Sequence, residues 1–396
     1  MYVSFYRKIG RLLRKQEVYE LIKEEQEEQI QNIINLEFQE RVEDTDTQEP
    51  PSGTLLSELP LDILQSITKR MNLFDYMNFR LTCKRFHEVN PISQWRDYCR
   101  YPLFLFPKDS NGTYELLDPF ENISRLITIP HISSNVLSSI EHYKDGWLLV
   151  RFGGRSLRYM YPFTFTPESW KYPPHILGSP RFGFSTCPTS SNCLTVGLCG
   201  LSTPCFDYSE SPNGEWKFYD TEFNPEEDIA FQPNYKTGPK YHNNAFYFLG
   251  KEGCLGEFRS IQGEISWNVY KYPFTEDRDT LFDSCYLVEL DGELVSVFIK
   301  ATGRCLEMFK FDISNKCWIE LDTLGDYILF LSTTSSYSLK AEKSEMANRI
   351  YLPRRKGNEI VFYSLDTRKY HTSGSADYGH DDLSGTKSQT SCCWIW

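Results

Sequence analysis

Large aromatic residues recur at a nearly constant interval through the second half of the chain. Trp170, Trp216, Trp267 and Trp318 are separated by 46, 51 and 51 residues, and Tyr370 follows the last of them after 52. Each aromatic opens a short apolar run and follows an aromatic-rich run by one turn. A repeat of about 50 residues restricts the fold severely, because every unit must contact its neighbours in the same way.

Four short apolar runs can be read within the clearest repeat units. One unit has runs at residues 286–290, 292–298, 306–312 and 318–321. A weaker unit begins at Pro102 and brings the count to about six units. Four strands per unit are typical of a propeller blade, and a large ring on each outer strand can cover the gap between blades. Two stacked sheets would also use regular strands, but the constant period favours radial repetition, so we predict an all-β propeller of about six four-stranded blades.

Irregular segments between the predicted strands are candidates for binding. Propeller ligands usually contact loops around the central channel, and the longest irregular segments here are 167–180, 225–239 and 333–347. The chain ends in Trp394-Ile395-Trp396, which we expect to pack against the propeller because exposed apolar residues promote association. The sequence does not identify a target or the loops that would bind it.

Residues 55–95 show helical spacing instead. Pro60 fits the first position of a helix, and Ile63, Leu64 and Ile67 then recur along one face. We expect Asp75 to cap a second helix. A third helix should open at Asn90, which Pro91 follows. Some forty residues bury little apolar surface, so a partner is expected.

This helical stretch resembles the F-box, which docks a substrate receptor onto the Skp-type adaptor of a cullin-RING ubiquitin ligase. The matching residues are Leu59-Pro60, Asp62-Ile63-Leu64, Ile67, Leu73, Asp75 and Arg80-Leu81-Thr82-Cys83-Lys84. Phe86 takes a position at which the family usually has Trp. The resemblance implies contact with the adaptor, and through it with cullin and RING subunits, by Leu59, Pro60, Ile63, Leu64 and Ile67.

The remainder of the chain is similar to the kelch-like, KIB-type propeller that follows the F-box in many plant proteins. The similarity is carried by Gly146-Trp-Leu-Leu-Val, Asn244-Ala-Phe-Tyr, Met308-Phe-Lys-Phe-Asp, Asn348-Arg-Ile-Tyr and Cys393-Trp-Ile-Trp. Together the two resemblances divide the chain into a charged helical extension with a flexible linker (1–53), an F-box (54–100) and a propeller (101–396).

Composition narrows the classes of partner. The chain has 54 acidic and 42 basic residues and a net charge of −12, which argues against nucleic acid or an anionic membrane as the main partner. It has no apolar run of membrane-spanning length and no apolar segment typical of a secretory signal near Met1, so we expect the protein in the cytoplasm, the nucleus or both. The cysteines are then expected to be reduced thiols.

No catalytic or metal-binding motif stands out. The seven histidines are scattered, and Cys187, Cys193, Cys199 and Cys205 are spaced by six residues and lack the close pairs of zinc sites. We therefore expect no metal, no cofactor and no catalysis by the chain itself. The favoured hypothesis is a substrate receptor that captures an unknown target protein for ubiquitination. The alternative is a propeller that binds a small molecule or acts as an enzyme, with the helices as a structural cap.

Overall fold

The structure is a computed structural model, and it describes most of the chain after residue 58. The described residues are 59–89, 92–108, 113–128, 138–152, 156–162, 167–171, 181–200, 203–211, 214–221, 229–234, 236–251, 253–271, 282–300, 302–304, 306–374, 379–389 and 392–396. The predicted charged extension and linker at residues 1–53 lie outside them. None of the helices in the described residues has the length and apolar character needed to cross a membrane.

Short helices open the described part of the chain. They are α3 (Leu61–Thr68), α4 (Leu73–Thr82), α5 (Lys84–Glu88) and the 3-10 helix η2 (Ile92–Tyr98). The helical character of this stretch is confirmed, but its internal boundaries differ from those we predicted.

The second helix has a different cap from the one predicted. Asn72 is the N-cap of α4, and its side-chain oxygen accepts a hydrogen bond from the backbone N–H of Asp75 at 2.9 Å. Asp75 instead lies in the first turn, where its charge suits the positive end of the helix dipole. The third α-helix is also earlier than predicted, because Cys83 is extended and separates α4 from α5. The segment after Pro91 forms η2 rather than an α-helix.

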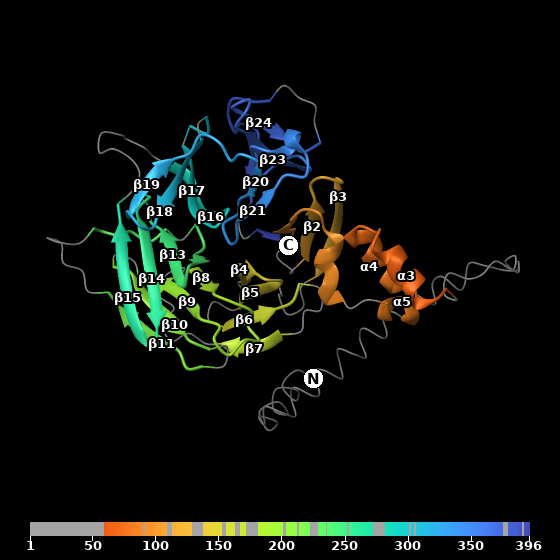
Figure 1. Ribbon diagram of the computed structural model, residues 1–396, viewed down its shortest axis with the longest axis horizontal. Helices are drawn as coiled ribbons and strands as arrows, with labels where there is room; N and C mark the ends of the chain where they lie inside the picture. The colour runs from red at the N-terminus through yellow and green to blue at the C-terminus, as the bar shows by residue number, and fades with distance from the viewer. Residues whose placement is uncertain are drawn as a thin grey trace, which may run out of the picture. The chain divides into compact units, whose positions relative to one another are not determined.

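Six sheets follow in the described residues (Figure 1). The first five contain four strands each and are antiparallel. Their strands are β26 (Cys393–Ile395), β1 (Leu103–Pro107), β2 (Thr113–Asp118) and β3 (Ile123–Thr128); β4 (Ser138–Lys144), β5 (Trp147–Phe152), β6 (Ser156–Met160) and β7 (Pro167–Lys171); β8 (Arg181–Phe184), β9 (Thr195–Cys199), β10 (Cys205–Ser209) and β11 (Lys217–Asp220); β12 (Lys240–His242), β13 (Ala245–Leu249), β14 (Leu255–Ile261) and β15 (Glu264–Tyr270); and β16 (Phe282–Leu290), β17 (Glu293–Lys300), β18 (Leu306–Asp312) and β19 (Cys317–Glu320).

The sixth sheet departs from the predicted four strands. It contains β20 (Tyr327–Phe330), β21 (Tyr337–Lys340), β22 (Arg349–Lys356), β23 (Glu359–Ser364), β24 (Lys369–Thr372) and β25 (Lys387–Ser388). Strand β21 and the short 3-10 helix η3 (Ser344–Met346) lie in segment 333–347, which we had predicted to be an irregular loop. β21 pairs with β20 and neighbours β16, so it takes the inner position of this blade.

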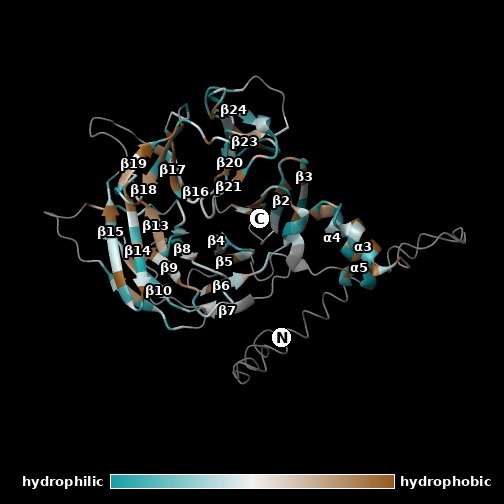
Figure 2. Ribbon diagram, in the orientation of Figure 1, coloured by the Kyte–Doolittle hydropathy of each residue, from teal (hydrophilic) through white to brown (hydrophobic). Residues whose placement is uncertain are grey.

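The inner strands of successive blades are neighbours around a ring. β26 neighbours β4, and β4, β8, β12, β16 and β21 then follow in order. The terminal strand β26 pairs with β1, so the first blade combines residues from both ends of the propeller. Figure 2 shows hydrophobic residues along strands such as β13 and β17, whose side chains are almost all buried. The predicted six-bladed propeller is therefore confirmed.

The periodic aromatics lie on or next to the outer strands, as predicted, although not always at the start. Trp267 is the fourth residue of β15, and its ring lies 4.8 Å from that of Phe206 in the preceding blade. A Cβ on Gly256 would collide with the Trp267 ring, so only glycine allows this close approach. Trp318 joins blades differently, because its indole Nε1 donates to the backbone oxygen of Lys271 at 2.9 Å.

The helices and the first two blades share one buried cluster. Tyr76 of α4 stacks on Tyr98 of η2 with ring centroids 3.9 Å apart, and Trp95 is fully buried beside them. The same cluster contains Leu103 of β1 and Ile140 of β4. Residues 61–396 accordingly form one compact unit. The boundary that we predicted at residue 100 stays a prediction.

Candidate functional site

The helical part carries exposed apolar side chains. Ile63 and Leu61 of α3 are 44% and 51% exposed, and Leu81 near the end of α4 is 66% exposed. Ile67 is partly buried one turn after Ile63. These side chains make the helical part a candidate contact surface.

The five residues predicted to contact an adaptor have different environments. Pro60 is exposed and Leu59 is partly buried, immediately before α3 in the chain. Leu64, by contrast, is fully buried, and so is Thr68 one turn later. Leu64 therefore has no exposed surface on α3 in this structure. The adaptor contacts predicted for Leu59, Pro60, Ile63 and Ile67 stay predictions.

Leu81 is an exposed residue that the sequence did not assign to a site. Its position within the Arg80–Lys84 match was the available signal, but helical spacing alone does not say which face of α4 is outward. The neighbouring residue Arg80 is held by contacts with other side chains of the helical part. Arg80 donates to the Tyr76 hydroxyl at 3.2 Å and lies 3.1 Å from His87 Nε2, and burial, followed by the Arg80 charge, lowers the pKa of His87.

Phe86 fills the position at which Trp is usual. Its side chain is buried and stacks on Phe79, with ring centroids 4.1 Å apart and planes inclined by 11°. This residue therefore packs α5 against α4. A phenyl ring in this position is thus accommodated between α4 and α5.

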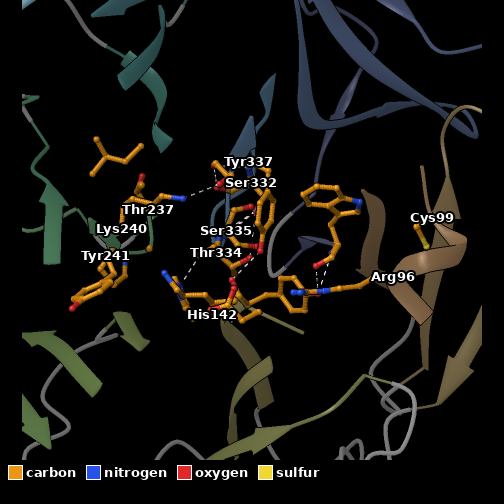
Figure 3. Close-up of a pocket in the computed structure, with 18 of the residues that line it drawn as sticks. Arg96, Cys99, His142, Thr237, Lys240, Tyr241, Ser332, Thr334, Ser335 and Tyr337 are labelled. Carbon is orange, nitrogen blue, oxygen red and sulfur yellow. Dashed lines mark hydrogen bonds between the residues drawn. The ribbon is translucent and has the colours of Figure 1, made fainter. Parts of the chain in front are cut away.

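A second candidate site is a pocket of about 410 Å³ where inner strands of several blades meet (Figure 3). Its walls come from the ends of β4 and β12, from Leu287 of β16, from the segment that leads into β21, and from η2. The pocket takes in parts of two segments that we singled out in the sequence, 225–239 and 333–347. Segment 167–180 lies largely outside the described residues.

The wall nearest β21 is built from hydroxyl side chains. Thr334 Oγ1 donates to the backbone oxygen of Cys392 at 3.0 Å, and Ser335 Oγ donates to that of Trp394 at 3.2 Å. The Tyr337 hydroxyl donates to the backbone oxygen of Tyr143 at 3.2 Å. These hydrogen bonds tie the inner end of the sixth blade to the closing strand and to β4, so the wall is held in place before any ligand arrives.

A β-bulge in β4 brings two titratable side chains to the inner ring. The register of β4 against β5 shifts between Ile140 and His142, so Glu141 is the extra residue. His142 Nδ1 lies 3.1 Å from the backbone oxygen of Thr334. Burial, with the charges of Lys144 and Lys240, lowers the pKa of His142 to about 3, so the imidazole is neutral and Nδ1 donates this hydrogen bond.

Cationic side chains also line the pocket. Arg96 comes from η2, Lys144 from the end of β4 and Lys240 from the start of β12. Sequence reasoning missed all three, because they stand singly on separate elements and share no motif. Among the described residues, no group of three or more His, Cys, Asp or Glu side chains is arranged to hold a metal ion.

Comparisons with known proteins match both parts of the chain. The family described as KIB1-4 beta-propeller matches residues 80–373, and the F-box domain matches residues 56–89. The F-box/kelch-repeat protein At1g57790 of Arabidopsis thaliana is 26% identical over 336 residues, which cover 81% of this chain and 90% of that protein. The F-box protein At3g56470 of the same plant is 26% identical over 298 residues, covering 73% and 75%.

Solved structures are less similar. A luciferin-regenerating enzyme has a TM-score of 0.35 and 13% identity, covering 67% of this chain and 80% of that chain. So low a score supports no inference about function.

Proposed function

Because the chain belongs to the KIB1-4 β-propeller family and carries an F-box at residues 56–89, we propose that it is the substrate-recognition subunit of an SCF-type ubiquitin ligase. The F-box docks on a Skp-type adaptor, which connects the chain to cullin and RING subunits. The propeller captures a target protein. Ubiquitin transfer is performed by an E2 enzyme recruited elsewhere in the complex, and the chain acts in the cytoplasm, the nucleus or both.

The observation that carries this proposal is the pair of exposed apolar residues on α3, the helix that lies within the F-box match. Ile63 and Leu61 of α3 lie on the surface, while the helical part shares a buried cluster with the first two blades. Because Ile63 is 44% exposed, a partner that covers it would gain about half of the roughly 1.5 to 3 kcal/mol that burial of a whole aliphatic side chain contributes.

The packing of the helical part also gives the complex a defined geometry. Tyr76 and Tyr98 stack at 3.9 Å, and Trp95 is fully buried, so no flexible hinge separates η2 from β1. A target held on the propeller would then sit at a fixed offset from the adaptor. Holding a target lysine near the loaded E2 raises its effective concentration, which is how a non-catalytic receptor accelerates transfer.

Affinity purification from plant cells tests the proposal. The full-length chain and its Ile63→Asp variant are purified after cullin activation has been blocked, so that captured targets are not degraded. Both forms should retain the same target proteins, whereas only the unaltered chain should retain adaptor and cullin. After the block is released, only the unaltered chain should shorten the half-life of those targets.

A matched control is available on the propeller. Leu126 of β3 is 58% exposed, so Leu126→Asp makes the same kind of change at an exposed aliphatic residue outside the F-box. This variant should behave as the unaltered chain does. The proposal fails if the unaltered chain recovers no adaptor, or if Ile63→Asp shortens target half-lives equally well.

A further inference from the structure

Three basic side chains converge on the pocket without carboxylate partners. Arg96, Lys144 and Lys240 line it, and within the described residues no ion pair of 4.0 Å or less involves any of them. Lys144 and Lys240 repel each other in this partly enclosed site, and an anion would relieve that repulsion. We propose that this pocket binds a small anion with an apolar or aromatic body, held by its carboxylate or phosphate group.

Lys240 is the first anchor for the anionic group. Figure 3 shows its side chain extending from β12 toward the segment before β21. Its Nζ donates to the backbone oxygen of Ser336 at 3.3 Å. An ammonium group has three N–H donors, so this single hydrogen bond leaves capacity for a ligand. Burial lowers the pKa of Lys240 to about 8.

Arg96 approaches from the opposite wall. Its Nε is buried and has no hydrogen-bond acceptor, although a buried N–H group is normally satisfied. Its guanidinium group hydrogen-bonds the Tyr143 side chain. A guanidinium group that lines a pocket is suited to a carboxylate or phosphate, because its planar set of N–H donors binds both with charge-assisted hydrogen bonds.

Acidic residues nearby offset part of this positive charge, because the carboxylates of Glu289 and Asp145 oppose the lowering of the Lys240 pKa by burial. Asp97 and Asp145 line the pocket but are exposed to solvent. Glu289 of β16 places a carboxylate oxygen 3.5 Å from His242 Nδ1 and is 43% exposed. Burial, followed by the positive charges of Lys144 and Lys240, lowers the pKa of the neighbouring His142, which is neutral.

The other residues that line the pocket favour a ligand with an apolar or aromatic part. Tyr143, Tyr241 and Tyr337 contribute aromatic rings, and Lys144 and Lys240 lie 5.2 and 5.9 Å from the ring centres of Tyr241 and Tyr337. A volume of about 410 Å³ is at the lower end of the range for small-molecule sites. The pocket therefore fits a small aromatic acid or aryl phosphate better than a long peptide or a bare inorganic ion.

Calorimetry on the full-length protein with simple probes tests this inference. Benzoate and phenyl phosphate carry the two anionic groups on the same ring, and benzamide is the uncharged analogue. At equal ionic strength, we expect benzoate or phenyl phosphate to bind at least about tenfold more tightly than benzamide, because charge-assisted hydrogen bonds are lost with the charge. The ratio of the two anions distinguishes a carboxylate site from a phosphate site.

Variants then locate the binding. Lys240→Met should weaken binding of the better anion about tenfold or more while the melting temperature stays equal or rises, since a costly buried charge has been removed. Lys340→Met is the matched control, because Lys340 lies at the end of β21, is 70% exposed and does not line the pocket. If Lys240→Met does not fold, Arg96→Gln provides the same comparison. Adaptor binding should be unchanged throughout, so failure here is distinguishable from failure of the proposed function.

The inference is overturned by any of three results. The first is that neither anion binds at millimolar concentration. The second is that benzamide binds as tightly as benzoate. The third is that the folded pocket variants bind the anions as well as the unaltered chain does.

Discussion

Trp394 of the closing strand β26 lies opposite Phe104 of β1 in the antiparallel ladder, and the centres of their rings are 4.7 Å apart. The indole Nε1 of Trp394 also donates to the backbone oxygen of Leu331, beyond the end of β20, at 2.8 Å. One side chain thus joins the first blade, which contains both ends of the propeller, to the sixth. Closure of the ring depends on the last few residues of the chain.

Truncating this side chain should destabilise the whole propeller. Because Trp394 is fully buried, Trp394→Ala should lower the free energy of unfolding by about 3 to 5 kcal/mol, measured by denaturant unfolding. Ile319→Ala on outer strand β19, where the side chain is 43% exposed, should cost less than about 1 kcal/mol. Equal losses in the two variants would show that β26 is not what closes the ring.

A buried carboxylate joins the second and third blades. Glu141 is fully buried, with one oxygen 3.0 Å from Arg151 Nε and the other 3.7 Å from Arg181 Nη1. Glu141→Gln should therefore cost about 2 to 4 kcal/mol of unfolding free energy, because two mostly buried guanidinium groups lose their counter-charge. Glu293→Gln is the control, since its pair with Lys310 is at 3.8 Å and half exposed and should contribute less than about 1 kcal/mol. An unchanged unfolding free energy in Glu141→Gln would show that this carboxylate does not stabilise the contact between the two blades.

His142 should make the fold sensitive to acid. Its pKa is lowered to about 3 by burial, whereas an unfolded histidine titrates near 6.5. The unfolded chain therefore takes up a proton first, and stability is lost as pH falls below about 6.5 toward 3 and is unaffected above it. Between pH 7 and 5 this residue should account for about 2 kcal/mol of lost unfolding free energy.

The His142→Asn variant isolates that contribution. The asparagine amide can still donate to the backbone oxygen of Thr334, but it has no proton to take up in this range. The loss in unfolding free energy between pH 7 and 5 should be smaller in the variant by about 2 kcal/mol. Identical pH dependence in the two proteins would mean that His142 already titrates normally in the folded state.

The architecture was predictable because it is periodic. The interval from Trp267 to Trp318 reports the blade repeat directly, since both rings sit on outer strands that meet a neighbouring blade. The position of β21 was not predictable in the same way. Residues 333–347 are polar and rich in Ser and Thr, and β21 forms there because it neighbours β16 around the channel, which is a tertiary effect.

The sites were predictable only in part. The Leu-Pro pair and the apolar residues after it locate the first helix, but the sequence does not say that Leu64 turns inward while Ile63 turns outward. The irregular segments 225–239 and 333–347 indicated part of the pocket wall, but its basic side chains left no signal. Arg96, Lys144 and Lys240 are single charges on three elements, and only closure of the ring brings them to one place.

Binding of the purified full-length chain to a Skp-type adaptor, measured by titration calorimetry, is the most direct test of the proposed function. We predict a one-to-one complex that weakens by at least about 30-fold, corresponding to 2 to 4 kcal/mol, both in Ile63→Asp and in the double variant Leu59→Ala with Pro60→Ala. Leu126→Asp should bind as the unaltered chain does. An unaltered chain that does not bind, or variants that bind with undiminished affinity, would contradict the assignment of this protein as an adaptor-docked receptor.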